Sequence, residues 1–180
     1  MGSFRIPDKM EGSKMVAITG FELQKWAEQT SRGWKHLVTT HHEILSFPCD
    51  IRETKSVAEL LQHIVAVELR YAERLNDLPQ TLYESIPFDS ARAIYATHDR
   101  AMGMLRPLLE RDEQFWEAVI EFKTRSAGTL RASRRAVLIH LLMHSVRHYA
   151  QLASLVRKQG ITPGWEMDYL FMDAAPAAAA

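Results

Sequence analysis

Four long segments in which apolar residues recur with a helical period account for most of the sequence, and they restrict the fold more than any other feature. Proline and glycine separate these segments, which span about residues 19–45, 54–77, 88–111 and 133–159. Pro107 lies inside the third segment, so we expect that helix to kink or to end early. Gly160 suits the C-cap of the fourth helix, and Pro163 prevents its continuation; one short helical turn is expected after it.

The link before the last long segment has an alternating pattern instead. Polar and apolar residues alternate over residues 119–124, and Ala127-Gly128 suits a turn, which predicts a short β-hairpin. Four long helices joined by fairly short links predict an all-α fold: an up-down-up-down four-helix bundle with a short β-hairpin before the last long helix. We expect a single domain over residues 1–173 and a disordered Ala-rich tail over residues 174–180.

Charge and hydropathy exclude several classes of partner. The chain has 22 lysines and arginines against 22 aspartates and glutamates, whereas nucleic-acid binders normally carry a basic surplus. No stretch approaches the ~20 apolar residues of a membrane span, and the first twenty residues lack the apolar run of a signal peptide. The single cysteine, Cys49, excludes an internal disulfide and fits a reducing compartment. We therefore expect a soluble cytoplasmic protein that binds neither nucleic acid nor a membrane.

Three of the eight histidines, His140, His144 and His148, recur every four residues in the last long segment. Residues four apart lie on one face of a helix, and two imidazoles so placed can bind one metal ion at about 2.0–2.1 Å. A third at i+8 has rotated by about 80° and does not easily reach the same ion. The spacing thus predicts a chelating pair, either His140/His144 or His144/His148, with a third ligand from another helix.

Helical-wheel positions favour the second pair. His148 lies at the edge of the apolar stripe of its helix, His144 lies slightly further out, and His140 points furthest toward the polar side. His63 lies at the edge of the stripe of the second helix. Edge positions on two helices border a half-open cleft, which predicts a site made of His63, His144 and His148. No glutamate follows the first histidine of either pair, so the general base of HExxH metalloproteases is missing.

The two histidine segments resemble the DinB-like superfamily of bacterial helical-bundle metalloproteins, which is unrelated to the DNA polymerase of that name. LLQHIVAVE at residues 60–68 resembles the family's LL-x-H-I-x-x-x-E, and HLLMHSVRHYAQL at residues 140–152, followed by LVRKQG, resembles its H-x-x-x-H-x-x-H/V-H-R-G-Q-L and L-R-x-x-G. Helix order and the hairpin match as well, so the resemblance covers most of the chain. It implies that the metal ligands are His63, His144 and His148. Tyr149-Ala150 replaces the family's Arg-Gly, so any role of that arginine with substrate is not carried over.

Three imidazoles plus an open position are typical of a catalytic metal site. Relatives in this superfamily include transferases that use low-molecular-weight thiols, so the resemblance implies a metal-dependent thiol S-transferase that acts on a small electrophile. The alternatives are a hydrolase that uses bound hydroxide and a non-catalytic metal-binding stress protein. Three imidazoles suit several divalent metals; zinc is the first choice, with nickel or iron next. The resemblance also implies a homodimer.

Other polar residues have weaker patterns. Gln151 faces the same way as His148, where it hydrogen-bonds a metal-bound water or substrate, supports a metal ligand from behind, or faces solvent. Glu68 lies in the apolar stripe of the second helix, where a carboxylate needs a partner, so we expect an ion pair or hydrogen bond to a neighbouring helix. His36, His41 and His42 are expected at the surface. A basic stretch is expected to be a solvated loop, or else to attract an anionic co-substrate: Lys123, Arg125, Arg131, Arg134 and Arg135.

Overall fold

The computed structural model describes residues 17–124, 127–172 and 174 of the chain. The expected Ala-rich tail, residues 174–180, lies outside the described residues except for Ala174. The described part contains five α-helices and one two-stranded antiparallel sheet, so the prediction of a helical fold with a short hairpin is confirmed. The helices are α1 (Gly20–Thr40), α2 (Val57–Leu75), α3 (Ala91–Leu105), α4 (Glu113–Glu117) and α5 (Arg134–Lys158). Short 3-10 helices lie at His42–Ser46, Ile51–Glu53, Tyr83–Ser85, Arg106–Glu110 and Tyr169–Met172.

Each long helix begins at a residue whose side chain caps it. The hydroxyl groups of Thr19, Ser56, Ser90 and Ser133 accept hydrogen bonds from backbone N–H groups in the first turns of α1, α2, α3 and α5. α3 ends at Leu105 and continues only as a 3-10 helix, as expected from the proline that follows. α1 ends five residues earlier than predicted, because the chain tightens into a 3-10 helix at His42–Ser46.

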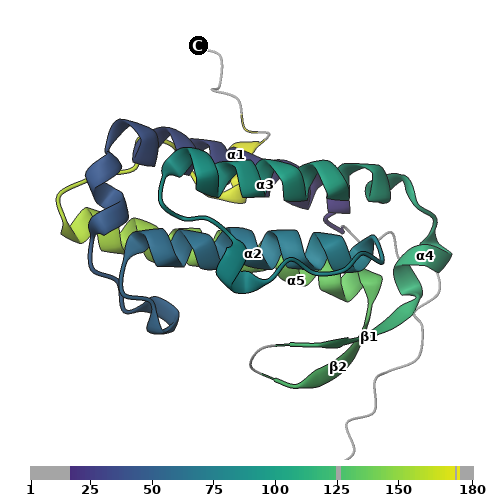
Figure 1. The fold of residues 1–180 in the computed structure, drawn as a ribbon. Helices are drawn as coiled ribbons and strands as arrows, with labels where there is room; N and C mark the ends of the chain where they lie inside the picture. Colours follow the sequence, from purple (N-terminus) through teal and green to yellow (C-terminus); the bar gives the residue numbers. More distant parts are fainter. Residues whose placement is uncertain (1–16, 125–126, 173, 175–180) are drawn as a thin grey trace, which may run out of the picture.

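The hairpin lies where the alternating pattern predicts it. β1 (Val119–Lys123) pairs with the antiparallel β2 (Thr129–Ser133), with Val119 opposite Ser133 and Lys123 opposite Thr129. Gly128, in the turn, has a φ of 70°, a conformation that glycine adopts readily. β2 leads directly into α5, so the hairpin projects beside the layer formed by α2 and α5 (Figure 1).

The four long helices lie in two layers, with α1 beside α3 and α2 beside α5 (Figure 1). The expected up-down-up-down order is wrong, because α2 and α3 run in the same direction. Glu68 of α2 contacts His98 of α3, and Asn76 at the end of α2 reaches Met104 near the end of α3. Parallel neighbours need a connection that returns along the helix.

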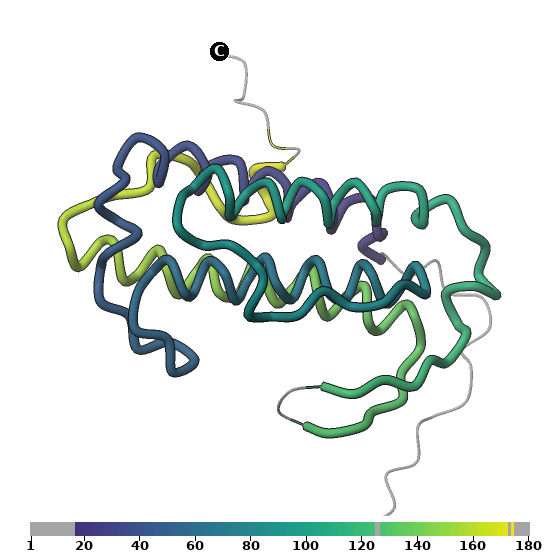
Figure 2. Tube along the Cα trace, in the orientation of Figure 1, coloured from purple at the N-terminus to yellow at the C-terminus, as the bar shows by residue number. Residues whose placement is uncertain are grey.

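Residues 76–90 provide that return. Figure 2 shows this segment running back along α2 before α3 begins. Gln62, near the start of α2, donates a hydrogen bond to the carbonyl of Ile86 at 2.6 Å, and the Thr81 N–H donates to the Glu73 carboxylate at 2.7 Å. An extended chain advances about 3.3 Å per residue against about 1.5 Å in a helix, so these few residues are long enough to span α2. A link with fewer residues than α2 can therefore still return along the whole length of that helix.

Large aromatic side chains join α1 to α5 in the core. Trp34 stacks on Tyr149 with ring centroids 5.9 Å apart, and both side chains are fully buried. Trp165, in the segment after α5, packs edge-on against Trp34 at 5.3 Å and lies over Gly33. Within the part of the chain that the structure describes, no helix is both long and apolar enough to cross a bilayer.

Candidate metal centre

Three imidazoles from two helices meet at the interface of α2 and α5. The Nε2 atoms of His63 on α2 and His144 on α5 are 3.1 Å apart, and the ring of His148 lies 4.4 Å from that of His144. One nitrogen from each of these rings lies within 4.8 Å of the other two. The structure therefore brings together the three histidines that the wheel positions and the family resemblance select.

His140 lies next to this cluster but outside it. Its ring is exposed and stands 5.6 Å from the ring of His144 on one side and 5.4 Å from the ring of Tyr71 on the other. The alternative chelating pair, His140 with His144, is therefore not the one that faces His63.

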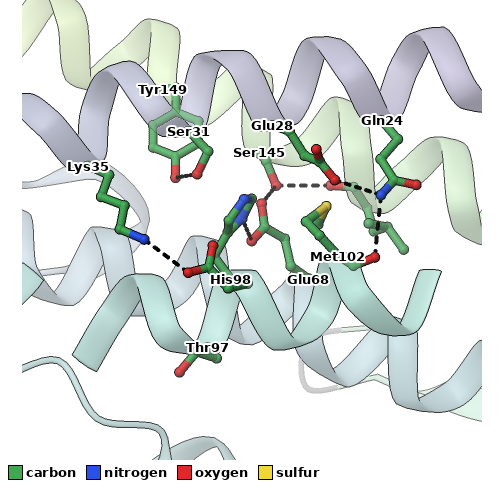
Figure 3. Close-up of polar contacts among 12 residues, drawn as sticks. Gln24, Glu28, Ser31, Lys35, Glu68, Thr97, His98, Met102, Ser145 and Tyr149 are labelled. Carbon is green, nitrogen blue, oxygen red and sulfur yellow. Dashed lines mark hydrogen bonds and ion pairs between the residues drawn. The ribbon is translucent and has the colours of Figure 1, made fainter. Parts of the chain in front are cut away.

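A buried hydrogen-bond network holds α5 in register with α2. The Glu68 carboxylate, 1% exposed, accepts hydrogen bonds from Ser145 Oγ at 2.6 Å and from His98 Nδ1 at 2.7 Å (Figure 3). The expectation that Glu68 bonds neighbouring helices is confirmed. Because Ser145 follows His144 directly, this contact fixes the rotation of α5 at the point where His144 must face α2.

Gln151 sets the proton position on His148. The Nδ1–H of His148 donates to Gln151 Oε1 at 2.7 Å, which leaves Nε2 with a free electron pair. That Nε2 accepts a hydrogen bond from the guanidinium of Arg147 at 3.3 Å. Arg147 is exposed, so a cation could take its place. Orientation of a histidine through its second nitrogen is the usual arrangement around protein-bound metals.

Burial keeps these rings neutral. It lowers the pKa of His144 to about 2, and the neighbouring His148 and His63 rings contribute. Burial also lowers the pKa of His148, against the opposing effect of the Gln151 hydrogen bond. Neutral imidazoles are the form that binds a metal ion, so both rings are ready ligands near pH 7.

The cluster passes two structural tests for a metal ion. First, four ligands at about 2.0–2.1 Å around a tetrahedral ion are about 3.3 Å apart, close to the 3.1 Å between the Nε2 atoms of His63 and His144. Second, His148 Nε2 has a free electron pair, because Nδ1–H of the same ring donates to Gln151 Oε1. A neutral imidazole with a free electron pair is the form that binds a metal ion.

The cluster opens on one side into a large cavity. His148 is 1% exposed and His144 8% exposed, while His63 is half-buried. A cavity of about 970 Å³ reaches His63 and His144 and extends along α2 toward the hairpin. Its size suits a small organic molecule, since ligand pockets commonly measure about 300–1,000 Å³.

Arg70 and Arg74 also line this cavity. No local pattern marks them in the sequence, because Phe122, whose ring packs on Arg74, lies far from it along the chain. The basic stretch does not form one patch. Lys123 borders the cavity and Arg125 lies outside the described residues, whereas two others are bound elsewhere: Arg134 to Asp77 and Arg135 to Glu117.

The fold and the cluster define a class: a helical protein with three histidines from two helices at the inner end of a ligand-sized cavity. The model of the DinB family matches residues 15–178, nearly the whole chain. The chain belongs to the DinB family. No curated protein matches it.

Proposed function

We propose that this DinB-family chain is a four-helix-bundle metalloprotein that binds one divalent ion through His63, His144 and His148 and transfers a low-molecular-weight thiol to a small electrophile. The observation that supports it best is the convergence of three histidines within 4.8 Å beside a cavity of about 970 Å³. Zinc is the first choice of metal, with nickel or iron as alternatives, because imidazole ligands suit all three.

The residues around the cluster have separate roles in this proposal. Burial keeps His144 and His148 neutral, and Gln151 holds the His148 ring with its Nε2 available. Ala66 and Val67 contribute apolar wall to the cavity beside His63, which limits the access of water to a bound substrate. When bound, a divalent ion lowers the pKa of a thiol and thereby supplies a nucleophile at neutral pH.

Thiol transfer is favoured over hydrolysis by the surroundings of the cluster. Glu59, one helical turn before His63, lines the cavity. Its carboxylate accepts a hydrogen bond from the Lys55 N–H, just before the start of α2, at 2.8 Å. The carboxylate nearest in sequence to His63 is thus already engaged. A thiol, which ionises far more readily than water, has less need of a general base.

The remaining proposals concern partners and compartment. We propose a small-molecule substrate, which the cavity supports. We propose no nucleic-acid partner, which the balanced charge supports. We also propose that the chain forms a homodimer. A cytoplasmic location is supported by Cys49, which is a free, buried thiol.

The test is to incubate zinc-loaded protein, produced without a histidine tag, with 1-chloro-2,4-dinitrobenzene and a panel of low-molecular-weight thiols. Thiol-dependent conjugation that disappears in His63→Ala supports the proposal. Turnover of an ester probe without thiol would replace it with a hydrolase. Tight metal binding with neither activity would leave a non-catalytic metal-binding protein. Elemental analysis of the same preparation identifies the metal.

A further inference from the structure

The cavity that reaches the histidines is rich in cations. Its lining includes five basic side chains but only three carboxylates, those of Glu53, Glu59 and Glu84. Glu53 and Glu84 are exposed, and Glu59 accepts the hydrogen bond from Lys55 described above. The basic side chains are Arg52, Arg70, Arg74, Lys123 and Arg147.

Arg74 is the most unusual of these cations because it is buried with no carboxylate partner among the described residues. It is 9% exposed, and its guanidinium packs against the rings of Tyr71 and Phe122, 4.6 and 4.3 Å from their centroids. It donates to two neutral oxygens, Gln80 Oε1 at 2.7 Å and the Lys123 carbonyl at 3.3 Å. Its Nε is buried with no hydrogen-bond partner among the described residues. Burial lowers the pKa of Arg74, against the opposing effect of the Tyr71 side chain, and the neighbouring Arg70 charge lowers it further.

Arg134 shows what a satisfied buried arginine looks like in the same fold. It is also 9% exposed, but it donates to both carboxylate oxygens of Asp77 at 2.8 Å and to the Leu75 carbonyl at 2.6 Å. A buried charge is costly unless a partner of opposite charge compensates it. Arg74 lacks that partner within the described chain, so the missing charge is expected from a ligand.

A second guanidinium points to the same place. Arg70 lies one turn before Arg74 on the same face of α2, and its guanidinium is 3.5 Å from the same Gln80 oxygen. Both arginines also line a neighbouring cavity of about 520 Å³ between α2 and the hairpin. Among the described residues that line that cavity, the carboxylate belongs to Glu121, which is exposed and lies opposite Arg131 in the register of the hairpin.

A row of rings connects this arginine pair to the histidine cluster. The Arg74 guanidinium lies 4.6 Å from the Tyr71 ring, the Tyr71 ring 5.4 Å from that of His140, and the His140 ring 5.6 Å from that of His144. One elongated molecule in the cavity can therefore reach the arginines with one end and the histidines with the other.

We propose that Arg74 and Arg70 form an oxyanion subsite, which binds a carboxylate or phosphate group of the small-molecule substrate while the opposite end of that substrate reaches His63 and His144. The anion subsite is inferred from the cavity and from Arg74, which is buried without a carboxylate partner among the described residues. Its assignment to the substrate rests on the function proposed above. Guanidinium groups suit this task because their planar donors match the oxygens of carboxylate and phosphate.

The first experiment measures anion binding alone by calorimetric titration of metal-free protein with succinate and with inorganic phosphate. Arg70→Met and Arg74→Met are each expected to weaken binding by about 10- to 100-fold, the usual effect of losing a charged hydrogen bond. Arg157→Met, an exposed arginine at the end of α5, is the matched control and should bind as the wild type does. The tighter of the two anions identifies the group. Circular dichroism checks that Arg74→Met folds, and Arg70→Met, at a half-buried position, serves if it does not.

The second experiment tests the link to the histidines with zinc-loaded protein. 3-Mercaptopropionate and longer mercaptoalkanoates are compared with mercaptoalkanols of the same length. At the chain length that spans the two sites, the acid should bind more tightly than the alcohol, and Arg70→Met should abolish the difference without lowering zinc content. Equal binding of acid and alcohol at every length, with no binding of succinate or phosphate, overturns the subsite while leaving thiol binding intact. Anion binding without any thiol binding instead overturns the proposed function.

Discussion

At the scale of single residues, the hydrogen bond between His148 and Gln151 decides which ring nitrogen can face a metal ion. Gln151→Leu removes the acceptor for His148 Nδ1–H, so the ring is free to rotate or to change tautomer. We expect zinc affinity to fall by about 10- to 100-fold, the usual cost of losing such a partner, as measured by competition with a chromophoric chelator. Gln151→Glu retains an acceptor and should bind zinc nearly as the wild type does. The exposed Gln114→Leu controls for the loss of an amide; an unchanged affinity in Gln151→Leu would contradict this role.

His63 and His140 give the sharpest comparison of two neighbouring histidines. His63 Nε2 lies 3.1 Å from His144 Nε2, whereas the His140 ring is exposed beside the cluster. His63→Ala should therefore reduce zinc affinity by more than the ~100-fold upper range for a supporting residue, because a ligand itself is lost. His140→Ala should leave affinity and stoichiometry almost unchanged. If the same chelator titration showed a larger loss of zinc affinity in His140→Ala than in His63→Ala, the chelating pair would be His140 and His144 instead.

The three clustered histidines could be found in the sequence, and the arginines of the cavity could not. The spacing of four and the position of His63 at the edge of a helical stripe are local features that a helical wheel reveals. Arg74, by contrast, is defined by Gln80 and Phe122, which only the return of the chain and the hairpin bring to it. An arginine on a helix face gives no local sign that it will be buried without a carboxylate.

At the scale of the helices, Glu68 connects α2 to both α3 and α5. Glu68→Leu leaves His98 and Ser145 without their buried partner, so we expect a loss of about 3–5 kcal/mol in the free energy of unfolding. Ser145→Ala removes one hydrogen bond of the network and should cost about 1–3 kcal/mol. Urea unfolding followed by circular dichroism measures both values. The exposed Glu121→Gln should change little, and a Glu68→Leu variant as stable as the wild type would show that the network contributes nothing.

Gly33 shows how a packing contact overrides helix propensity. A Cβ at this position would lie 2.2 Å from the Trp165 ring, so Gly33→Ala must displace the segment after α5. We expect a loss of about 1–3 kcal/mol from overpacking. Gly103→Ala on α3 meets nothing within 4 Å and should gain about 0.5–1 kcal/mol, as in an ordinary helix. Urea unfolding of both variants measures these changes in the free energy of unfolding. If Gly33→Ala were stabilised as Gly103→Ala is, the close contact between Gly33 and Trp165 would be contradicted.

Most helix positions could be predicted from the sequence, but not the direction of α3. Caps such as Ser90 and breakers such as Pro107 act within a few residues, so the helix ends follow from local chemistry. The parallel course of α2 and α3 depends on the hydrogen bond from Gln62 to Ile86 and on the other contacts of the returning segment. Such contacts between residues far apart in sequence leave no periodic pattern to read.

At the scale of the whole molecule, buried histidines make the stability of the metal-free protein depend on pH in opposite directions: His144 and His148 in one, His98 in the other. Burial lowers the pKa of His144 to about 2, so below the ordinary histidine value of about 6.5 the unfolded chain binds a proton that the folded chain does not. Stability must then fall as the pH decreases from about 6.5. Burial would also lower the pKa of His98, but the Glu68 carboxylate outweighs burial and raises it. The contribution of His98 is thus complete below about pH 6.5 and is lost as the pH rises through the raised pKa.

Stability in the presence of a chelator is therefore expected to be greatest near about pH 6.5, with a slope on the acid side of up to about 1.4 kcal/mol per pH unit from His144. Urea midpoints measured from pH 5 to 8.5 test this, and two variants separate the causes. His144→Gln should reduce the slope on the acid side only, because glutamine does not titrate, and the part that remains comes from His148, whose pKa burial also lowers. His98→Gln should flatten the alkaline side only. If His144→Gln kept the full acid slope, the His144 ring would not be kept neutral in the folded protein. That result would contradict the proposal that burial prepares this ring to bind a metal ion.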